Sequence, residues 1–245
     1  MTGTPEKHNR RAPPVWSPIL SLQTHIPAGL PRIDLDALCR ALVEQGWAVF
    51  ALADTAMLTA LREEALALWQ EDELTRAGIG RADDFDIVRE IRRDKTKWFD
   101  GASEAQAAYL DFAETLRVGI NERLLLGLFA FEAHYAVYEP GGFYRRHLDS
   151  FRGARNRILS SVLYLNPGWE PADGGLLRLF DERDDSVMAD IVPECGTFAV
   201  FLSEEIPHEV TAALKARFSI AGWHRCNDLG RAPALQARVL PLAAP

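Results

Sequence analysis

Three features of the sequence predict a mostly β fold with flanking α-helices. Before about residue 130, hydrophobic residues recur at the spacing of amphipathic helices. After Ala130 they fall into short runs separated by Gly, Pro, Asn and Asp, as in successive β-strands. No helical stretch lies between these runs, which argues against a parallel α/β sheet. The sequence therefore predicts a double-sheet roll, the double-stranded β-helix or jelly roll, with the N-terminal helices packed on the outer face of one sheet.

Three helices and one strand are expected ahead of the roll. The first helix begins after Ile33, where Asp34 or Asp36 can cap it. A short buried strand follows Gly46, and two longer helices come next. These later elements are expected at residues 47–50, 54–73 and 104–128.

Eight short strands are expected to form the roll itself, because each run carries β-prone residues bounded by turn residues. Their expected ranges are 135–139, 143–150, 157–166, 175–180, 187–192, 197–202, 208–212 and 217–225. The chain then divides into four parts. These are a weakly ordered tail (1–31), a helical support region (32–130) containing a β-loop (88–98), the roll (131–227) and a C-terminal tail (228–245).

The composition is that of an ordinary soluble globular protein, with 48% hydrophobic and 25% charged residues among 245. The net charge of −8 argues against a general nucleic-acid or acidic-membrane binder. The N-terminal stretch lacks the apolar core of a signal peptide, and no apolar run approaches the length of a bilayer span. Three cysteines without a CxxC spacing indicate free thiols in a reducing compartment. We therefore expect a cytoplasmic protein.

The segment His147-Leu148-Asp149 is the strongest candidate for a metal site. On a strand, residues i and i+2 point to the same side, so His147 and Asp149 project together. His208 opens a later strand, which an antiparallel roll can fold back across the barrel mouth. Two imidazoles and one carboxylate form the facial ligand set of non-haem Fe(II) enzymes, which leaves the opposite face open. The remaining histidines are interpreted as structural: His8, His25, His134 and His224.

A polar pocket wall is expected on the last strand, where Arg217, Ser219 and Trp223 point to one side. Ser160 and Tyr164 share one side of the long strand 157–166, so Tyr164 can present its hydroxyl to the same anion as Arg217. Arginine holds a carboxylate by two parallel hydrogen bonds. A ferrous ion, the Asp149 carboxylate and a dicarboxylate carry one net negative charge, which Arg217 neutralises inside a low-dielectric barrel. The pattern favours a dicarboxylate cosubstrate.

These residues resemble the 2-oxoglutarate and Fe(II)-dependent oxygenases, and within them the prolyl 4-hydroxylase-like branch. More narrowly, the chain is similar to the oxygen-sensing prolyl hydroxylases and their bacterial relatives from about residue 33 to 225. The motifs that carry the resemblance are Tyr138…Gly141…Tyr144…His147-Leu148-Asp149, Arg157, Tyr164-Leu165-Asn166, Gly174-Gly175, Leu177-Arg178, Pro207-His208-Glu209-Val210, Arg217…Trp223 and, ahead of the roll, Ile91-Arg92-Arg93-Asp94-Lys95-Thr96-Lys97-Trp98.

The resemblance implies a role for each matching position. The His147, Asp149 and His208 side chains would ligate iron, and Arg217 and Tyr164 would hold the distal carboxylate of 2-oxoglutarate. The pocket would be lined by Tyr138, Ser160 and Trp223. The implied reaction hydroxylates a C–H bond with dioxygen and releases succinate and carbon dioxide, with ascorbate as a candidate reductant of the iron.

The segment 88–98 is the most basic stretch of an acidic protein. In the resembling family it forms a mobile loop beside the substrate, which suggests substrate contacts by Arg92, Asp94 and Trp98. The implied substrate is a prolyl residue in a polypeptide, and a free amino acid or other small molecule is the alternative. The related nucleic-acid demethylases need a second arginine where this chain has Trp223, so nucleic acid is not expected as a partner.

Two other classes of protein compete with this interpretation. A metal-binding jelly roll of the cupin kind would not use 2-oxoglutarate, and substitution of Arg217 would then leave turnover unchanged. An inactive sensor or binding module would keep the fold but release no succinate with iron in air. The sequence sets neither the oligomeric state nor the identity of the substrate.

Overall fold

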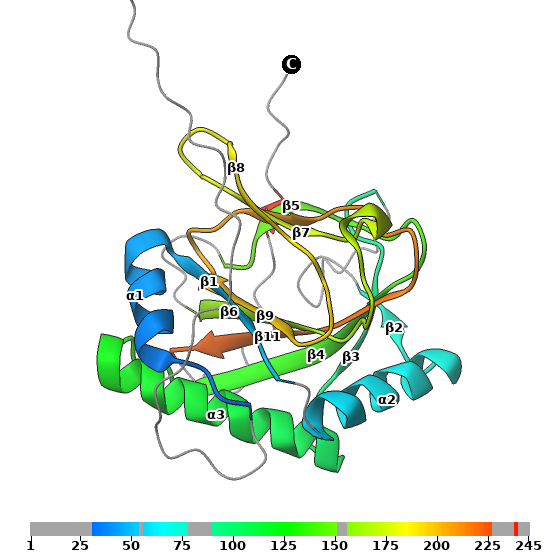
Figure 1. Ribbon diagram of the computed structural model, residues 1–245, viewed down its shortest axis with the longest axis horizontal. Coiled ribbons are helices and arrows are strands. Elements are labelled where there is room, and N and C mark those ends of the chain that lie inside the picture. Colours follow the sequence, from blue (N-terminus) through cyan, green and yellow to red (C-terminus); the bar gives the residue numbers. More distant parts are fainter. Residues whose placement is uncertain (1–30, 54–55, 78–89, 151–155, 227–237, 240–245) are drawn as a thin grey trace, which may run out of the picture.

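The computed structural model describes residues 31–53, 56–77, 90–150, 156–226 and 238–239. Two antiparallel sheets face each other, and three helices cover the outer face of the larger sheet (Figure 1). The predicted double-stranded β-helix with helices on one sheet is confirmed. The N-terminal tail predicted for residues 1–31 lies almost wholly outside the described residues, and so do His8 and His25.

Every pairing between neighbouring strands of the two sheets is antiparallel. The larger sheet has the order β1-β9-β6-β11-β4-β3-β2, and the smaller sheet has the order β12-β5-β10-β7-β8. In the larger sheet the strands are β1 Trp47–Ala51, β2 Thr75–Arg76, β3 Lys95–Trp98, β4 Ala130–Tyr138, β6 Arg157–Tyr164, β9 Thr197–Leu202 and β11 Arg217–Arg225. The strands of the smaller sheet are β5 Tyr144–Leu148, β7 Leu177–Phe180, β8 Val187–Ile191, β10 His208–Val210 and β12 Arg238–Val239.

All eight strands predicted for the roll are present, with ends that differ by a few residues. The strand predicted after Gly46 is also present as β1, and it joins the larger sheet beside β9. The short strands β2 and β3 extend this sheet beyond β4. Within the predicted C-terminal tail, β12 pairs with β5 beside His147.

The three predicted helices are α1 Leu35–Gln45, α2 Ala56–Gln70 and α3 Glu104–Leu124. The Asp34 side chain caps α1 by accepting a hydrogen bond from the backbone N–H of Ala37 at 2.9 Å. The predicted end of the third helix at residue 128 is wrong, because Leu125 adopts a left-handed conformation with φ 52° and ends α3. Among the described residues, no helix is long and apolar enough to cross a membrane.

The main hydrophobic core lies between the helices and the outer face of the larger sheet. Alternate residues of β6 and β11 point into it, which is the pattern expected from strand periodicity. The opposite face of the same strands points between the two sheets, toward β5 and β10. Two adjacent residues of β6 therefore lie in different environments, with Leu163 in the helix-facing core and Tyr164 between the sheets.

Candidate active site

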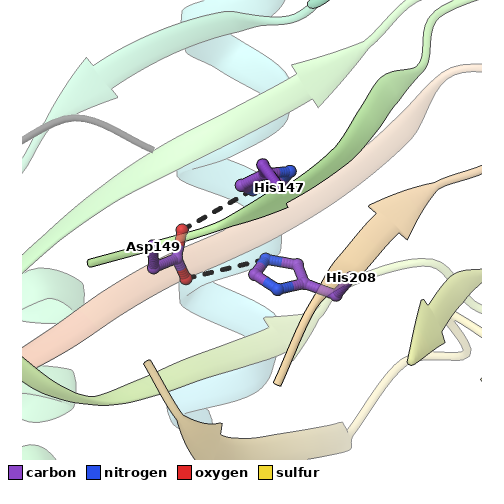
Figure 2. Close-up of side chains that lie close together, drawn as sticks. All are labelled: His147, Asp149 and His208. Atoms are coloured by element: carbon purple, nitrogen blue, oxygen red, sulfur yellow. Dashed lines mark ion pairs between the residues drawn. The ribbon is translucent and has the colours of Figure 1, made fainter. Parts of the chain in front are cut away.

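The structure brings His147, Asp149 and His208 together between the two sheets. One ligand atom from each lies within 4.8 Å of the others, and all three residues are buried. The Asp149 carboxylate lies 3.6 Å from the Nε2 atom of each histidine, through Oδ1 to His147 and through Oδ2 to His208 (Figure 2). The pairing of β5 with β10 places His147 directly opposite His208. The three residues predicted from spacing therefore form one cluster.

Backbone carbonyls fix both imidazole rings. The Nδ1 atom of His147 lies 2.8 Å from the carbonyl oxygen of Arg145, and that of His208 lies 3.0 Å from the carbonyl oxygen of Ile206. A carbonyl oxygen only accepts hydrogen bonds, so each Nδ1 carries the proton and each Nε2 keeps its lone pair. Both lone pairs are thus available to a metal ion next to the Asp149 carboxylate.

The electrostatics of the cluster keep its groups in the states that ligate a metal. Burial lowers the pKa of His208 to about 4, and the neighbouring His147 ring adds to this effect. Burial opposes ionisation of Asp149, but the two imidazoles and Arg157 outweigh it and hold its pKa well below the usual range. A neutral His208 and an ionised Asp149 suit a divalent cation.

A buried cation, Arg217, lies at the start of β11, against the Tyr164 ring between the two sheets. Arg217 is only 1% exposed, and its Nε donates to the carbonyl oxygen of Gly175 at 2.7 Å, while one terminal nitrogen lies 3.2 Å from the Ser219 hydroxyl. Its guanidinium carbon lies 5.0 Å from the centre of the Tyr138 ring and 4.9 Å from that of Tyr164. No carboxylate pairs with Arg217 among the described residues, so its buried charge is suited to an anionic ligand.

The structure places the other predicted pocket residues as follows. The Tyr164 hydroxyl is buried beside Arg217 without a hydrogen-bond partner among the described residues, and burial raises its pKa to about 12. Ser219 and Tyr138 contact Arg217. Ser160 instead donates its hydroxyl proton to the Oδ2 atom of Asp149 at 2.6 Å.

Trp223 lies in an aromatic cluster next to β3. The Arg157 guanidinium carbon is 3.7 Å from the centre of its ring, and the rings of Trp98 and His134 are 6.1 and 5.3 Å away. The buried indole Nε1 of Trp223 has no hydrogen-bond partner among the described residues. The Nδ1 atom of His134 lies 3.0 Å from the carbonyl oxygen of Tyr135, and its ring packs against Trp98 and Trp223, away from the His-Asp-His cluster.

The predicted substrate loop contacts the His-Asp-His cluster through the aromatic ring of Tyr144. Arg92 makes two hydrogen bonds to the buried Asp94 carboxylate, at 2.6 and 2.8 Å. The same guanidinium lies 4.7 Å above the Tyr144 ring, which stacks on His147 with ring centres 3.6 Å apart. Residues 88 and 89 lie outside the described residues, and Trp98 at the other end is 46% exposed.

Two residues of the site were missed by the sequence analysis. Ser203 follows β9 and lies 2.8 Å from the Ser160 hydroxyl, and nothing in its neighbourhood along the chain distinguishes it from other serines. Glu132 binds Arg157 and Arg225, at 2.7 and 3.0 Å, and so holds Arg157 against Trp223. The register of β4 with β11 places Glu132 opposite Trp223. Glu132 could therefore be predicted as a site residue only once this strand pairing is known.

Comparison with known proteins is consistent with this geometry. The family model for the 2OG-Fe(II) oxygenase superfamily matches residues 133–225. A prolyl-4-hydroxylase structure from Pseudomonas putida is 42% identical, with a TM-score of 0.70, and the match covers 79% of this chain and 99% of that one. The chain belongs to the 2OG-Fe(II) oxygenase superfamily. Its members use Fe(II), 2-oxoglutarate and dioxygen, which fits the His-Asp-His cluster described above.

Two further relatives of this 2OG-Fe(II) oxygenase are named as prolyl hydroxylases. The hypoxia-inducible factor prolyl hydroxylase of Caenorhabditis elegans is 31% identical over 216 residues, which are 79% of this chain and 28% of the relative. The chain thus spans less than a third of that protein. A Trichoplax adhaerens prolyl hydroxylase bound to a peptide fragment of hypoxia inducible factor has the same fold, with a TM-score of 0.69 at 24% identity over 78% of this chain and 88% of that one.

Proposed function

We propose that this protein is a prolyl hydroxylase that acts on a polypeptide. It couples hydroxylation of a C–H bond of a prolyl residue to conversion of 2-oxoglutarate and dioxygen into succinate and carbon dioxide. Two observations together carry the proposal: a buried His-Asp-His cluster, and Arg217, a buried cation without a carboxylate partner among the described residues. The prolyl hydroxylases among its relatives support the choice of proline, and the peptide in the Trichoplax complex supports a polypeptide.

The donor set fits the two groups that this chemistry requires. His147, Asp149 and His208 would hold Fe(II), which supplies the activation of dioxygen when bound. Arg217 would pair with the distal carboxylate of 2-oxoglutarate through its unused N–H groups, and the Tyr164 hydroxyl would donate to the same anion. The cosubstrate pocket would be completed by Tyr138, Ser219 and Trp223.

The polypeptide would approach past β3 and the loop before it. Trp98 exposes nearly half of its surface next to Trp223 and presents an aromatic face to a prolyl ring. Arg92 and Asp94 would hold the loop in a fixed position relative to the His-Asp-His cluster, because the Arg92 guanidinium packs on Tyr144 and the Tyr144 ring stacks on His147. We place the reaction in the cytoplasm, where ascorbate or another reductant can return the iron to the ferrous state.

The deciding experiment begins with anaerobic binding of Fe(II) and 2-oxoglutarate to the full chain. Admission of air in the presence of lysate polypeptides should then release succinate, and mass spectrometry should find a gain of one oxygen on proline. If the one-oxygen gain is found only on free proline or another small molecule, the substrate is that small molecule and the proposed polypeptide substrate is rejected. Turnover that does not depend on 2-oxoglutarate, or on Arg217, would favour a cupin-like metal protein instead.

A further inference from the structure

The three residues of the His-Asp-His cluster are held in place by different contacts. Both imidazole rings belong to paired strands and are fixed by backbone carbonyls. Asp149 instead follows the last residue of β5, so no strand pairing holds its backbone. The orientation of its carboxylate therefore depends on side-chain contacts, and among the described residues the side chain that donates a hydrogen bond to it is Ser160.

Two buried hydroxyl groups lead to the Asp149 carboxylate. Ser160 lies in the middle of β6, and its Oγ is 2.6 Å from the Oδ2 atom of Asp149. Ser203 follows β9, and its Oγ is 2.8 Å from the Oγ of Ser160. Both serines are at most 1% exposed, so neither hydroxyl exchanges its partner for solvent.

The direction of these hydrogen bonds follows from the inventory of donors. A serine hydroxyl has one proton to donate, and an ionised carboxylate only accepts. Ser160 must therefore donate to Asp149, which leaves its oxygen to accept the proton of Ser203. Two hydrogen bonds that run in one direction polarise each other and strengthen the contact to the carboxylate.

The backbone keeps this pair of serines rigid. The N–H of Ser203 donates to the carbonyl oxygen of Ile158 at 3.0 Å, which continues the pairing of β9 with β6. The carbonyl oxygen of Ser203 accepts from the N–H of Ser150 at 3.3 Å, next to Asp149. Ser203 thus ties the end of β5, in the smaller sheet, to the middle of the larger sheet.

We infer that Ser203 and Ser160 form a serine relay that positions the Asp149 carboxylate for ligation of the metal through one oxygen. The hydrogen bond from Ser160 engages Oδ2, so Oδ1 is the oxygen with its lone pairs free of protein donors among the described residues. One-oxygen ligation leaves more positions open for cosubstrate and dioxygen than chelation by both oxygens would. The inference rests on the metal site of the proposed function, and it assigns to Ser160 a positioning role in place of contact with 2-oxoglutarate.

Titration of the metal-free full chain with Co(II) tests the relay without any turnover. Co(II) takes similar N/O ligands to Fe(II), and its absorption spectrum reports coordination. S160A should weaken Co(II) binding by about 10- to 100-fold, which is the usual effect of losing a partner of a metal ligand. S203A should weaken it less, and S160T should restore binding because threonine keeps the hydroxyl.

S161A is the matched control, because Ser161 is the next residue of β6, equally buried, and faces the helices. Its Co(II) affinity should equal that of the wild type, whatever happens to its melting temperature. Unchanged Co(II) affinity in S160A, or the same loss in S161A, would overturn the relay. If S160A does not fold, S203A decides, and unchanged affinity there rejects the inference. A wild-type chain that binds no Co(II) would instead reject the proposed function.

Discussion

The two faces of the larger sheet differ in how their buried polar groups are used. His224 on the outer face and His208 between the sheets are both buried, and burial lowers the pKa of each to about 4. The Nε2 atom of His224 forms a hydrogen bond with the carbonyl oxygen of Ala113 in α3. His208 instead bonds through Nδ1 and leaves Nε2 facing Asp149. Burial alone therefore does not distinguish a structural histidine from a candidate ligand, whereas a carboxylate facing the free nitrogen does.

The same contrast holds along single strands. The outward residues Leu163 of β6 and Ile220 of β11 pack against the helices, and the inward residues Tyr164 and Arg217 keep donors without protein acceptors. We infer that the outer face supplies stability and the inner face supplies binding. Four predictions test this division, in order of decreasing effect.

Removal of a metal ligand should give the largest effect. D149A and H208A should weaken Co(II) or Fe(II) binding by more than about 100-fold, because loss of an outer partner alone costs 10- to 100-fold. Isothermal titration under anaerobic conditions measures this affinity. H224A on the outer face is the control, and it should lower the melting temperature but leave metal affinity within about twofold. Equal metal affinity in H208A and the wild type would contradict the assignment of metal binding to the inner face.

Substitution of Arg217 should raise the KM for 2-oxoglutarate without lowering the free energy of unfolding. R217M removes a buried charge that lacks an acidic partner among the described residues, so the free energy of unfolding should stay the same or rise. Loss of the pair with the distal carboxylate should cost about 2–4 kcal/mol, or about 30- to 1,000-fold in the KM for 2-oxoglutarate. R178A, at an exposed ion pair of β7, should change neither quantity. A large loss of stability in R217M would show that the arginine is structural.

Adjacent residues of β6 give the sharpest separation of the two faces. L163A should destabilise the protein by about 2–5 kcal/mol, because it opens a cavity in the helix-facing core. Y164F removes a hydroxyl without a partner among the described residues, so urea denaturation should show little change. Its KM for 2-oxoglutarate should nevertheless rise severalfold. The opposite result for either variant would contradict the division.

The smallest expected effect is a pH dependence of the stability of the metal-free protein. Burial lowers the pKa of three histidines, His134, His208 and His224, to about 4 each, against about 6.5 in the unfolded chain. Between about pH 6.5 and 4 the unfolded state therefore binds more protons, and stability falls as the pH falls. The limiting slope is about 1.4 kcal/mol per pH unit for each histidine.

Urea denaturation at several pH values between 7 and 5 measures this slope, and a variant such as H134Q should reduce it by about a third of its limiting value. A free energy of unfolding that stays constant over this range would show that the histidines titrate normally. Binding of a metal to His208 should steepen the fall, because protons then compete with the metal for the same nitrogen.

The sequence predicted the fold and the members of the His-Asp-His cluster because both follow from local periodicity. A spacing of two along a strand places His147 and Asp149 on one side, and the start of β10 places His208 opposite. The end of α3 was not predictable in this way, because a leucine, Leu125, takes the left-handed position that glycine or asparagine usually fills. Contacts such as that of Ser203 with Ser160 depend on which strands pair, and only the folded sheet sets that order.

The loop before β3 adds a contact of the same kind. Arg92 and Asp94 pair with each other, and the Arg92 guanidinium lies over the Tyr144 ring. Spacing along the sequence does not indicate this contact with Tyr144, because it joins two segments that are far apart in the chain.

Gly175 has a consequence for the size of the cavity. Its φ of +63° and its position against Arg217 leave no room for a side chain, because a Cβ atom there would lie 2.9 Å from the Cδ atom of the arginine. Even alanine would force the Arg217 side chain to shift. Under the proposed function, the length of the diacid that fits would therefore be set partly by a missing methyl group, in a residue that need not touch the acid.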